Sequence, residues 1–114
     1  MIRRGEIYWV NLDPVVGSEA DKTRPALVLS NDINNEHAAT ITVLAISSQL
    51  KRVYPFEVVL KKELSGLSED SKVMAHQILT IDKRRLIGQP LGPTLDDDLL
   101  SRIDAAVKIH LQLS

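Results

Sequence analysis

An arginine directly followed by a proline, Arg24-Pro25, is the first place in this sequence where residue type and spacing suggest chemistry. Proline pushes the residue before it toward extended backbone, and proline itself is accepted at the first position of a strand. Arg24 is therefore expected to be extended at the start of the short apolar run that follows. Its permanently charged guanidinium could bind an anion there, or it could be a solvated charge where a buried strand meets water.

Two further polar strings could contribute to a site. Ser47, Ser48 and Gln49 follow an apolar run, so they would offer two hydroxyls and an amide where a strand leaves the core. His76 and Gln77 lie inside another apolar run. The serines lack the Gly-x-Ser-x-Gly context of a serine hydrolase. Polar strand ends and a structural histidine are the alternatives to a functional role.

Metal and cofactor chemistry is not indicated by the sequence. The 3 histidines show no metal-ligand spacing, and the chain contains no cysteine for a disulfide or a thiolate site. Phosphate-binding glycine patterns are also absent. We therefore expect no metal and no other cofactor.

Length and charge narrow the possible classes. A chain of 114 residues predicts one domain, spanning residues 1–114, with a single modest core. The formal net charge of −1 is not that of a general nucleic-acid binder, so a polyanion site would have to be a local patch. Lys22, Arg24, Lys51 and Arg52 lie near strand ends and could form one. With no signal-peptide pattern and no stretch long enough to span a membrane, the chain is expected in the cytoplasm.

Hydrophobic patterning predicts five strands, at residues 6–12, 25–29, 40–47, 56–60 and 72–81. Tyr8 and Trp9 alternate on the first strand, so one of them should fill the core. Strict alternation in the fifth strand would point His76 and Gln77 to opposite faces. Residues 30–37 are expected to form a turn or a single helical turn, and 82–86 a short helical turn.

The C-terminal segment 96–112 predicts a helix, because apolar residues recur there at helical spacing. Thr94 and Asp97 have the spacing of a capping box at its start. The apolar arc is wide, which fits either a deep seat within the chain or a dimer partner. Together the elements predict a mainly β protein with α, a small antiparallel barrel with a C-terminal helix.

Four blocks recur in order over nearly the whole chain: R-R-G-E-I-Y-W-V-N-L-D-P-V-V-G-S-E, T-R-P-A-L-V-L-S-N-D, A-I-S-S-Q and Q-I-L-T-I-D-K-R-R-L. Their order and spacing resemble the MazF/PemK family of toxin endoribonucleases from type II toxin–antitoxin systems. The resemblance implies an SH3-like barrel of the CcdB/MazF type, a homodimer, and metal-independent cleavage of single-stranded RNA or mRNA at short sequences. It also implies a MazE-like antitoxin whose flexible, acidic C-terminal tail covers the RNA groove.

The resemblance also suggests residue roles. Arg24 matches the family's catalytic arginine, and Ser47 stands where the family commonly has a catalytic threonine. The residues expected to contact substrate are Glu19, Lys22, Ser48, Gln49, His76 and Gln77. Two other functions stay open: a CcdB-like toxin that binds DNA gyrase without being an enzyme, and an SH3-like interaction module without activity.

Overall fold

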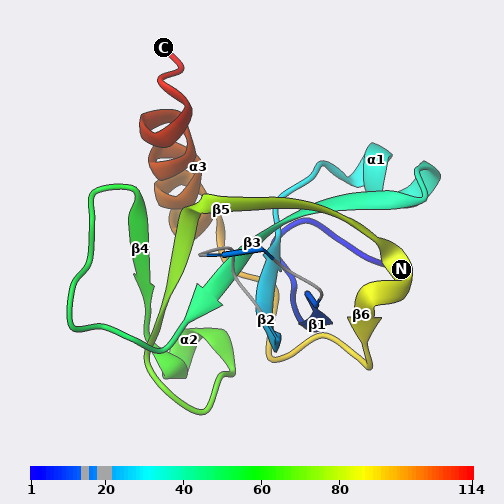
Figure 1. Cartoon of the computed structure of the whole chain (residues 1–114), viewed down its shortest axis with the longest axis horizontal. Helices are drawn as coiled ribbons and strands as arrows, with labels where there is room; N and C mark the ends of the chain where they lie inside the picture. The colour runs from blue at the N-terminus through cyan, green and yellow to red at the C-terminus, as the bar shows by residue number, and fades with distance from the viewer. Residues whose placement is uncertain (14–15, 18–21) are drawn as a thin grey trace.

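The computed structural model describes residues 1–13, 16–17 and 22–114, and these form a six-stranded antiparallel sheet with a C-terminal helix (Figure 1). In chain order the elements are β1 Ile7–Asn11, β2 Thr23–Val28, α1 Asp32–His37, β3 Thr40–Ser47, β4 Glu57–Leu60, α2 Lys62–Ser65, β5 Ser71–Asp82, the 3₁₀ turn η1 Lys83–Arg85, β6 Leu86–Ile87 and α3 Asp97–Leu111. The strands lie in the order β4-β5-β3-β2-β1-β6.

The expected class, mainly β with α, is confirmed, and each of the five predicted strands is present. The barrel, however, is not closed by strand pairing. β4 and β6 are the two edges of the sheet, and they contain only 4 and 2 residues. β6 and α2 were not predicted, because elements this short show no hydrophobic period.

β5 is sharply bent, as Figure 1 shows, and the bend changes the alternation of its side chains. Its first half pairs with both β4 and β3 and its second half with β3 alone, and the register against β3 shifts between Leu44 and Ile46. Ala75 and Ile78 both pack in or against the same core cluster, so the two-residue alternation slips between them. His76 and Gln77 lie at this slip. The alternation predicted for residues 76–81 holds for Ile78, which packs against the helix-side cluster, and for Leu79 and Ile81, which pack with the other cluster, but it does not continue back to Ala75.

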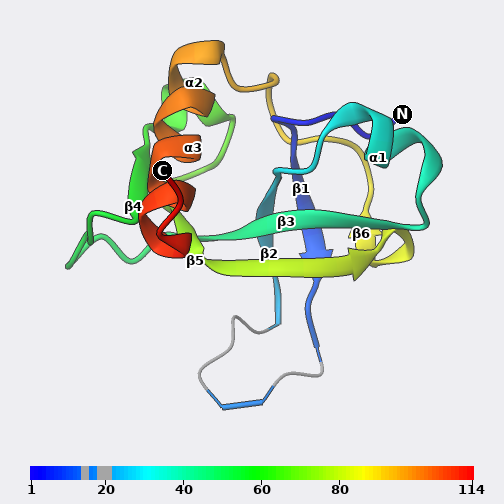
Figure 2. The same cartoon turned by 90° about the horizontal axis from the view of Figure 1, so that it is seen from above.

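Two core clusters cover the two faces of the sheet. α3 lies against β4 and β5, as Figure 2 shows from above, and closes the helix-side core. The helix-side core contains Ile7, Leu27, Leu44, Ile46, Val58, Leu60, Val73, Ala75, Leu95, Leu99, Ile103 and Ala106. The second core, on the other face, contains Tyr8, Val10, Leu12, Ala26, Val28, Ile41, Val43, Ala45 and Ile81.

α3 begins at a different cap from the one predicted. The carboxylate of Asp96 accepts the backbone N–H of Leu99 at 2.9 Å, so Asp96 is the N-cap and the Thr94–Asp97 capping box is wrong. One side of the helix is buried in the helix-side core. Three large apolar side chains near its end are exposed, at 58, 48 and 58%: Ile109, Leu111 and Leu113. The chain itself therefore covers only part of the apolar arc.

Candidate active site

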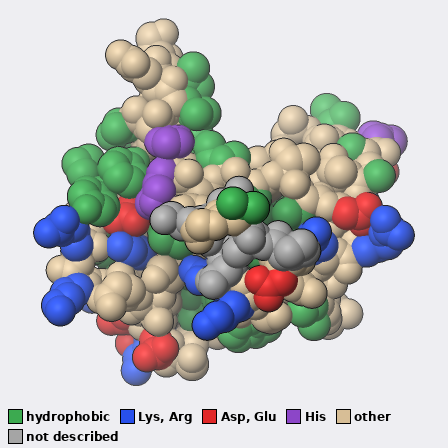
Figure 3. All heavy atoms as spheres, viewed as in Figure 1, with side chains coloured by type: hydrophobic (Ala, Val, Ile, Leu, Met, Phe, Trp, Pro, Cys, Tyr) green, Lys and Arg blue, Asp and Glu red, His purple; other side chains and the backbone are tan. Residues whose placement is uncertain are grey.

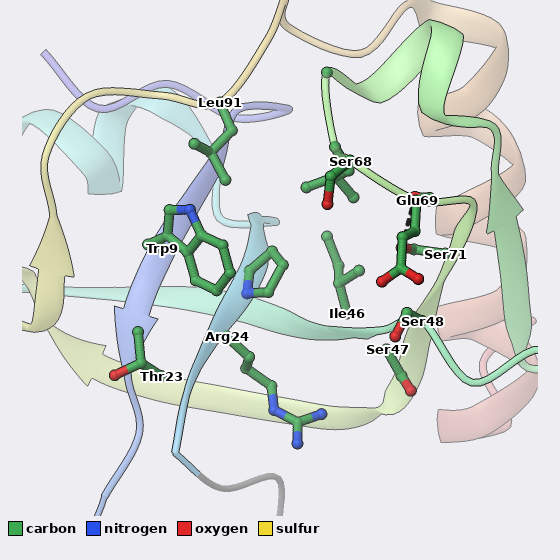
Figure 4. Close-up of a pocket in the computed structure, with 13 residues that line it drawn as sticks. Trp9, Thr23, Arg24, Ile46, Ser47, Ser48, Ser68, Glu69, Ser71 and Leu91 are labelled. Carbon is green, nitrogen blue, oxygen red and sulfur yellow. Dashed lines mark hydrogen bonds between the residues drawn. The ribbon is translucent and has the colours of Figure 1, made fainter.

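Arg24 and Ser47 lie on the neighbouring strands β2 and β3 and share one face of the sheet. Ala26 pairs with Ala45, and both belong to the second core. Because side chains alternate along a strand, Arg24 and Ser47, each two residues beyond this pair, lie on the same face. Figure 4 shows both side chains turned away from Trp9. The fold thus brings the two predicted catalytic residues together where β2 begins and β3 ends.

Lys72 extends this pair to a third strand. It pairs with Ser47 across β3 and β5, so Arg24, Ser47 and Lys72 form a row across three strands, which we call the cationic row. The Nζ of Lys72 donates to Oε1 of Glu57 at 3.0 Å and to the carbonyl oxygen of Arg52 at 2.7 Å. The side chains of Lys72 and Glu57 are only 9 and 2% exposed. Charges are almost never so buried unless they are paired.

The Lys72–Glu57 pair was not singled out from the sequence. In the sequence, the pair shows only as one charged residue within each of two apolar strands. Such a charge is equally compatible with a solvent-facing side of a strand, and the two residues are separated along the chain. The pairing of β4 with β5 is what brings them together.

A tight turn follows Ser47. The Oγ of Ser47 accepts the backbone N–H of Gln49 at 3.1 Å. The Oε1 of Gln49 in turn accepts the backbone N–H of Lys51 at 2.9 Å. A hydroxyl that accepts through one lone pair keeps its O–H to donate, so Ser47 can donate toward a ligand. The part of Gln49 suited to contact a ligand is its amide nitrogen, because the turn uses its oxygen. Ser48 is exposed beside them.

Lys22 is held just before β2. Its backbone N–H donates to the Asp13 carboxylate at 2.8 Å, and its carbonyl accepts from Leu12 at 3.0 Å. Its φ of 61° lies in the left-handed region, which is uncommon for a residue other than glycine. Lys22 is thus placed two residues before Arg24, with an exposed side chain. Glu19, the other predicted loop residue, lies outside the described residues.

His76 and Gln77 are half-buried at the bend of β5. The His76 ring packs edge-on against Phe56, with ring centroids 4.8 Å apart. Its Nδ1 is buried, without a hydrogen-bond partner in the described part of the chain. Burial lowers the pKa of His76; Glu57 opposes this shift, whereas His110 and Lys72 add to it. His76 is therefore neutral at pH 7, and any ligand would meet the ring through atoms other than Nδ1.

A cavity of about 480 Å³ lies beside the same end of the sheet (Figure 4). Its apolar lining includes Trp9, Pro25, Ile46, Leu67 and Leu91. Trp9 is 41% exposed whereas Tyr8 is buried, which confirms that one of the two fills the core. Arg24 and Ser47 border the cavity but point away from Trp9, so cavity and cationic row occupy different sides of one sheet end.

Neither a cluster of metal ligands nor a membrane-spanning helix is present within residues 1–13, 16–17 and 22–114. No three His, Cys, Asp or Glu side chains there are grouped to hold a metal ion. Nor is any helix in those ranges long and apolar enough to cross a membrane.

The PemK-like, MazF-like toxin of type II toxin-antitoxin systems is the family that matches residues 3–111, and the chain belongs to it. The chain is 44% identical over 118 residues to endoribonuclease MazF9 of Mycobacterium tuberculosis. The matched region covers 99% of this chain and 98% of the relative. It is 39% identical over 114 residues to endoribonuclease EndoA of Bacillus subtilis, covering 99 and 97%. A crystal structure of MazE–MazF from Deinococcus radiodurans has a TM-score of 0.75 at 26% identity, covering 99 and 97%. The CcdB-like alternative is not favoured.

Proposed function

We propose that this toxin is a metal-independent, sequence-specific endoribonuclease that cuts single-stranded RNA, including mRNA, and thereby inhibits translation and growth. The observation that carries the proposal is the row of Arg24, Ser47 and Lys72, in which the Arg24 guanidinium and the Ser47 hydroxyl share one face beside the Lys72–Glu57 ion pair. Relatives named endoribonucleases, matched over nearly their whole length, support it.

RNA carries the nucleophile for this reaction. The 2′-oxygen forms a bond to the adjacent phosphorus while the bond from phosphorus to the 5′-oxygen breaks. A base takes the 2′-hydroxyl proton, and an acid protonates the departing 5′-oxygen. The products are a 2′,3′-cyclic phosphate and a 5′-hydroxyl. The enzyme has to align the 2′-oxygen with the leaving group and stabilise negative charge on the phosphoryl oxygens.

Arg24 supplies the charge stabilisation in this proposal. Its guanidinium has several fixed donors that suit the oxygens of a phosphorane, and because a guanidinium stays charged it stabilises negative charge rather than transferring a proton. Pro25 holds the backbone of Arg24 extended before substrate arrives. Ser47 donates its O–H to a phosphoryl oxygen, and Ser48 is the second hydroxyl within the same turn.

The remaining predicted residues contact the RNA on either side of this phosphate. Lys22 lies beside Arg24 and would bind a neighbouring phosphate, with Glu19 in the same loop. Single-stranded RNA exposes the Watson–Crick edges of its bases, which the amides of Gln49 and Gln77 can read. His76 would contribute through the outer edge of its ring.

The protein is proposed to act as a homodimer of single-domain chains, residues 1–114, in the cytoplasm. The exposed apolar end of α3 supports a dimer, because exposed apolar clusters mark interaction sites. A MazE-like antitoxin with a flexible, acidic tail would bind over the cationic row. The family description and the MazE–MazF structure support this partner.

The test is cleavage of a long single-stranded RNA in EDTA, with the fragment ends identified. Discrete fragments with cyclic-phosphate and 5′-hydroxyl ends are expected. Arg24→Ala should cut roughly 100- to 1,000-fold more slowly while still dimerising, because one preorganised donor is lost. Arg102→Ala, an exposed arginine on α3, is the matched control and should cut normally. Equal cleavage of 2′-O-methylated RNA, or undiminished toxicity of Arg24→Ala, would contradict the proposal.

A further inference from the structure

The segment that follows Ser47 carries an aromatic cluster that the proposed chemistry does not use. Tyr54 and Phe56 stack with ring centroids 5.1 Å apart and planes within 6° of each other. His76 packs edge-on against Phe56, and the His110 ring lies 6.2 Å from Phe56. Figure 3 shows histidine side chains gathered beside a hydrophobic patch and next to charged side chains on one face.

The placement of these rings is unusual for a chain with so few aromatic residues. The sequence contains 1 Phe, 1 Trp and 2 Tyr; Tyr8 lies in the second core, and Phe56 is half-buried against the helix-side core. Tyr54 is 41% exposed although its ring could bury a large apolar area. An exposed ring backed by a second parallel ring offers a flat surface on which a further ring can stack.

The stack is held rigidly and is flanked by positive charge. Glu57 accepts the backbone N–H of Tyr54 at 2.9 Å, and Lys72 binds both Glu57 and the carbonyl of Arg52. Nη1 of Arg52 donates to the Tyr54 hydroxyl at 3.0 Å, and its guanidinium carbon lies 5.7 Å from the ring centre. That hydrogen bond raises the pKa of Arg52, whose guanidinium is charged in any case.

Lys72 joins this stack to the cationic row. It pairs with Ser47 of β3, and its ammonium donates to Glu57, which follows Phe56 in the chain, and to the carbonyl of Arg52. At about 4.8 Å between strands and about 3.3 Å per residue, Phe56 and His76 lie on the order of 10–15 Å from Ser47. A single-strand-binding domain contacts roughly 4–16 nucleotides of its ligand, and a strand of that length is long enough to reach from Ser47 to these rings.

We propose that Tyr54 and Phe56 form a base-stacking platform, on which an unpaired RNA base stacks against Tyr54 while the neighbouring phosphates lie near Arg52 and the cationic row. The inference rests on the proposed RNA substrate and adds a subsite to it. The base would extend the two-ring stack to three, and stacking of this kind tolerates any base because each has a π-face. His76 backs Phe56 and positions the platform.

The test measures binding to a fluorescein-labelled pool of mixed-sequence 2′-O-methyl RNA 12-mers, which the proposed enzyme binds but cannot cut. Tyr54→Ala should weaken binding by about 5- to 150-fold, the range found when a stacking ring is removed. Tyr54→Trp keeps a stacking ring and should bind like the wild type. Val53→Ala is the matched control: Val53 is 42% exposed, lies next in the chain and belongs to none of the ring contacts.

Each outcome separates the platform from the proposed function. Equal binding by wild type and Tyr54→Ala, with RNA cleavage intact in the wild type, would overturn the platform alone. No binding and no cleavage by the wild type would overturn both. If Tyr54→Ala instead turned a dimer into a monomer in sedimentation, the patch would be an interface between copies, and the platform would again be wrong.

Discussion

The buried ion pair between Lys72 and Glu57 gives the sharpest prediction from the structure. Removing one partner of such a pair leaves an uncompensated charge, which costs about 3–5 kcal/mol. Lys72→Met removes the ammonium but keeps most of the hydrocarbon volume. The Glu57 carboxylate is 2% exposed and accepts hydrogen bonds from the Lys72 ammonium and the Tyr54 N–H. After the substitution it would lose the first of these and keep the second. Lys72→Met should therefore lower the free energy of unfolding by about 3–5 kcal/mol, or Tm by roughly 10–30 °C.

The double variant Lys72→Met/Glu57→Gln tests the physical reason. It removes both charges, and the Gln oxygen can still accept the Tyr54 N–H. Since a neutral pair of similar volume is often as stable as a buried ion pair, most of the lost stability should return. The assay is urea unfolding of all variants, analysed as a two-state transition.

Lys61→Met is the matched control for this prediction. Lys61 pairs with Asp70 at 3.8 Å, but its side chain is 65% exposed. The same substitution there should cost less than about 1 kcal/mol. If Lys72→Met were no more destabilising than Lys61→Met, or if the double variant were as unstable as the single one, the reasoning about the buried pair would be refuted.

Two further predictions concern backbone packing and pH. Gly66→Ala should cost about 2–5 kcal/mol in thermal unfolding, because φ is 76° and a Cβ would lie 2.4 Å from the Gly92 Cα. Gly88→Ala, at φ 70° with open space, should cost only about 1–2 kcal/mol, and equal losses would refute the clash. Because the pKa of His76 is lowered on folding, the unfolded chain binds more protons as pH falls below about 6.5, so stability should fall there. His76→Gln should show a shallower fall in urea unfolding between pH 7 and 5; an identical slope would contradict this assignment.

Much of the local structure could be predicted from the sequence. The strands were found within one or two residues of their ends, because β-branched runs and turn-forming residues act over short distances. Arg24 at the start of β2 and the division of Tyr8 and Trp9 between core and surface follow from the same local rules. The choice of Asp96 as the cap of α3 did not, because several residues at 94–98 can serve as caps and packing selects among them.

The sequence by itself determined the elements and the residues that could act, whereas the tertiary structure decided which of those residues meet. Arg24, Ser47 and Lys72 come from three strands, and only the register between those strands aligns them in one row. The slip in β5 turns His76 toward Phe56, and the β4–β5 pairing buries Glu57 against Lys72. Register depends on contacts between residues far apart in the chain, and one residue of shift moves a side chain to the other face of the sheet.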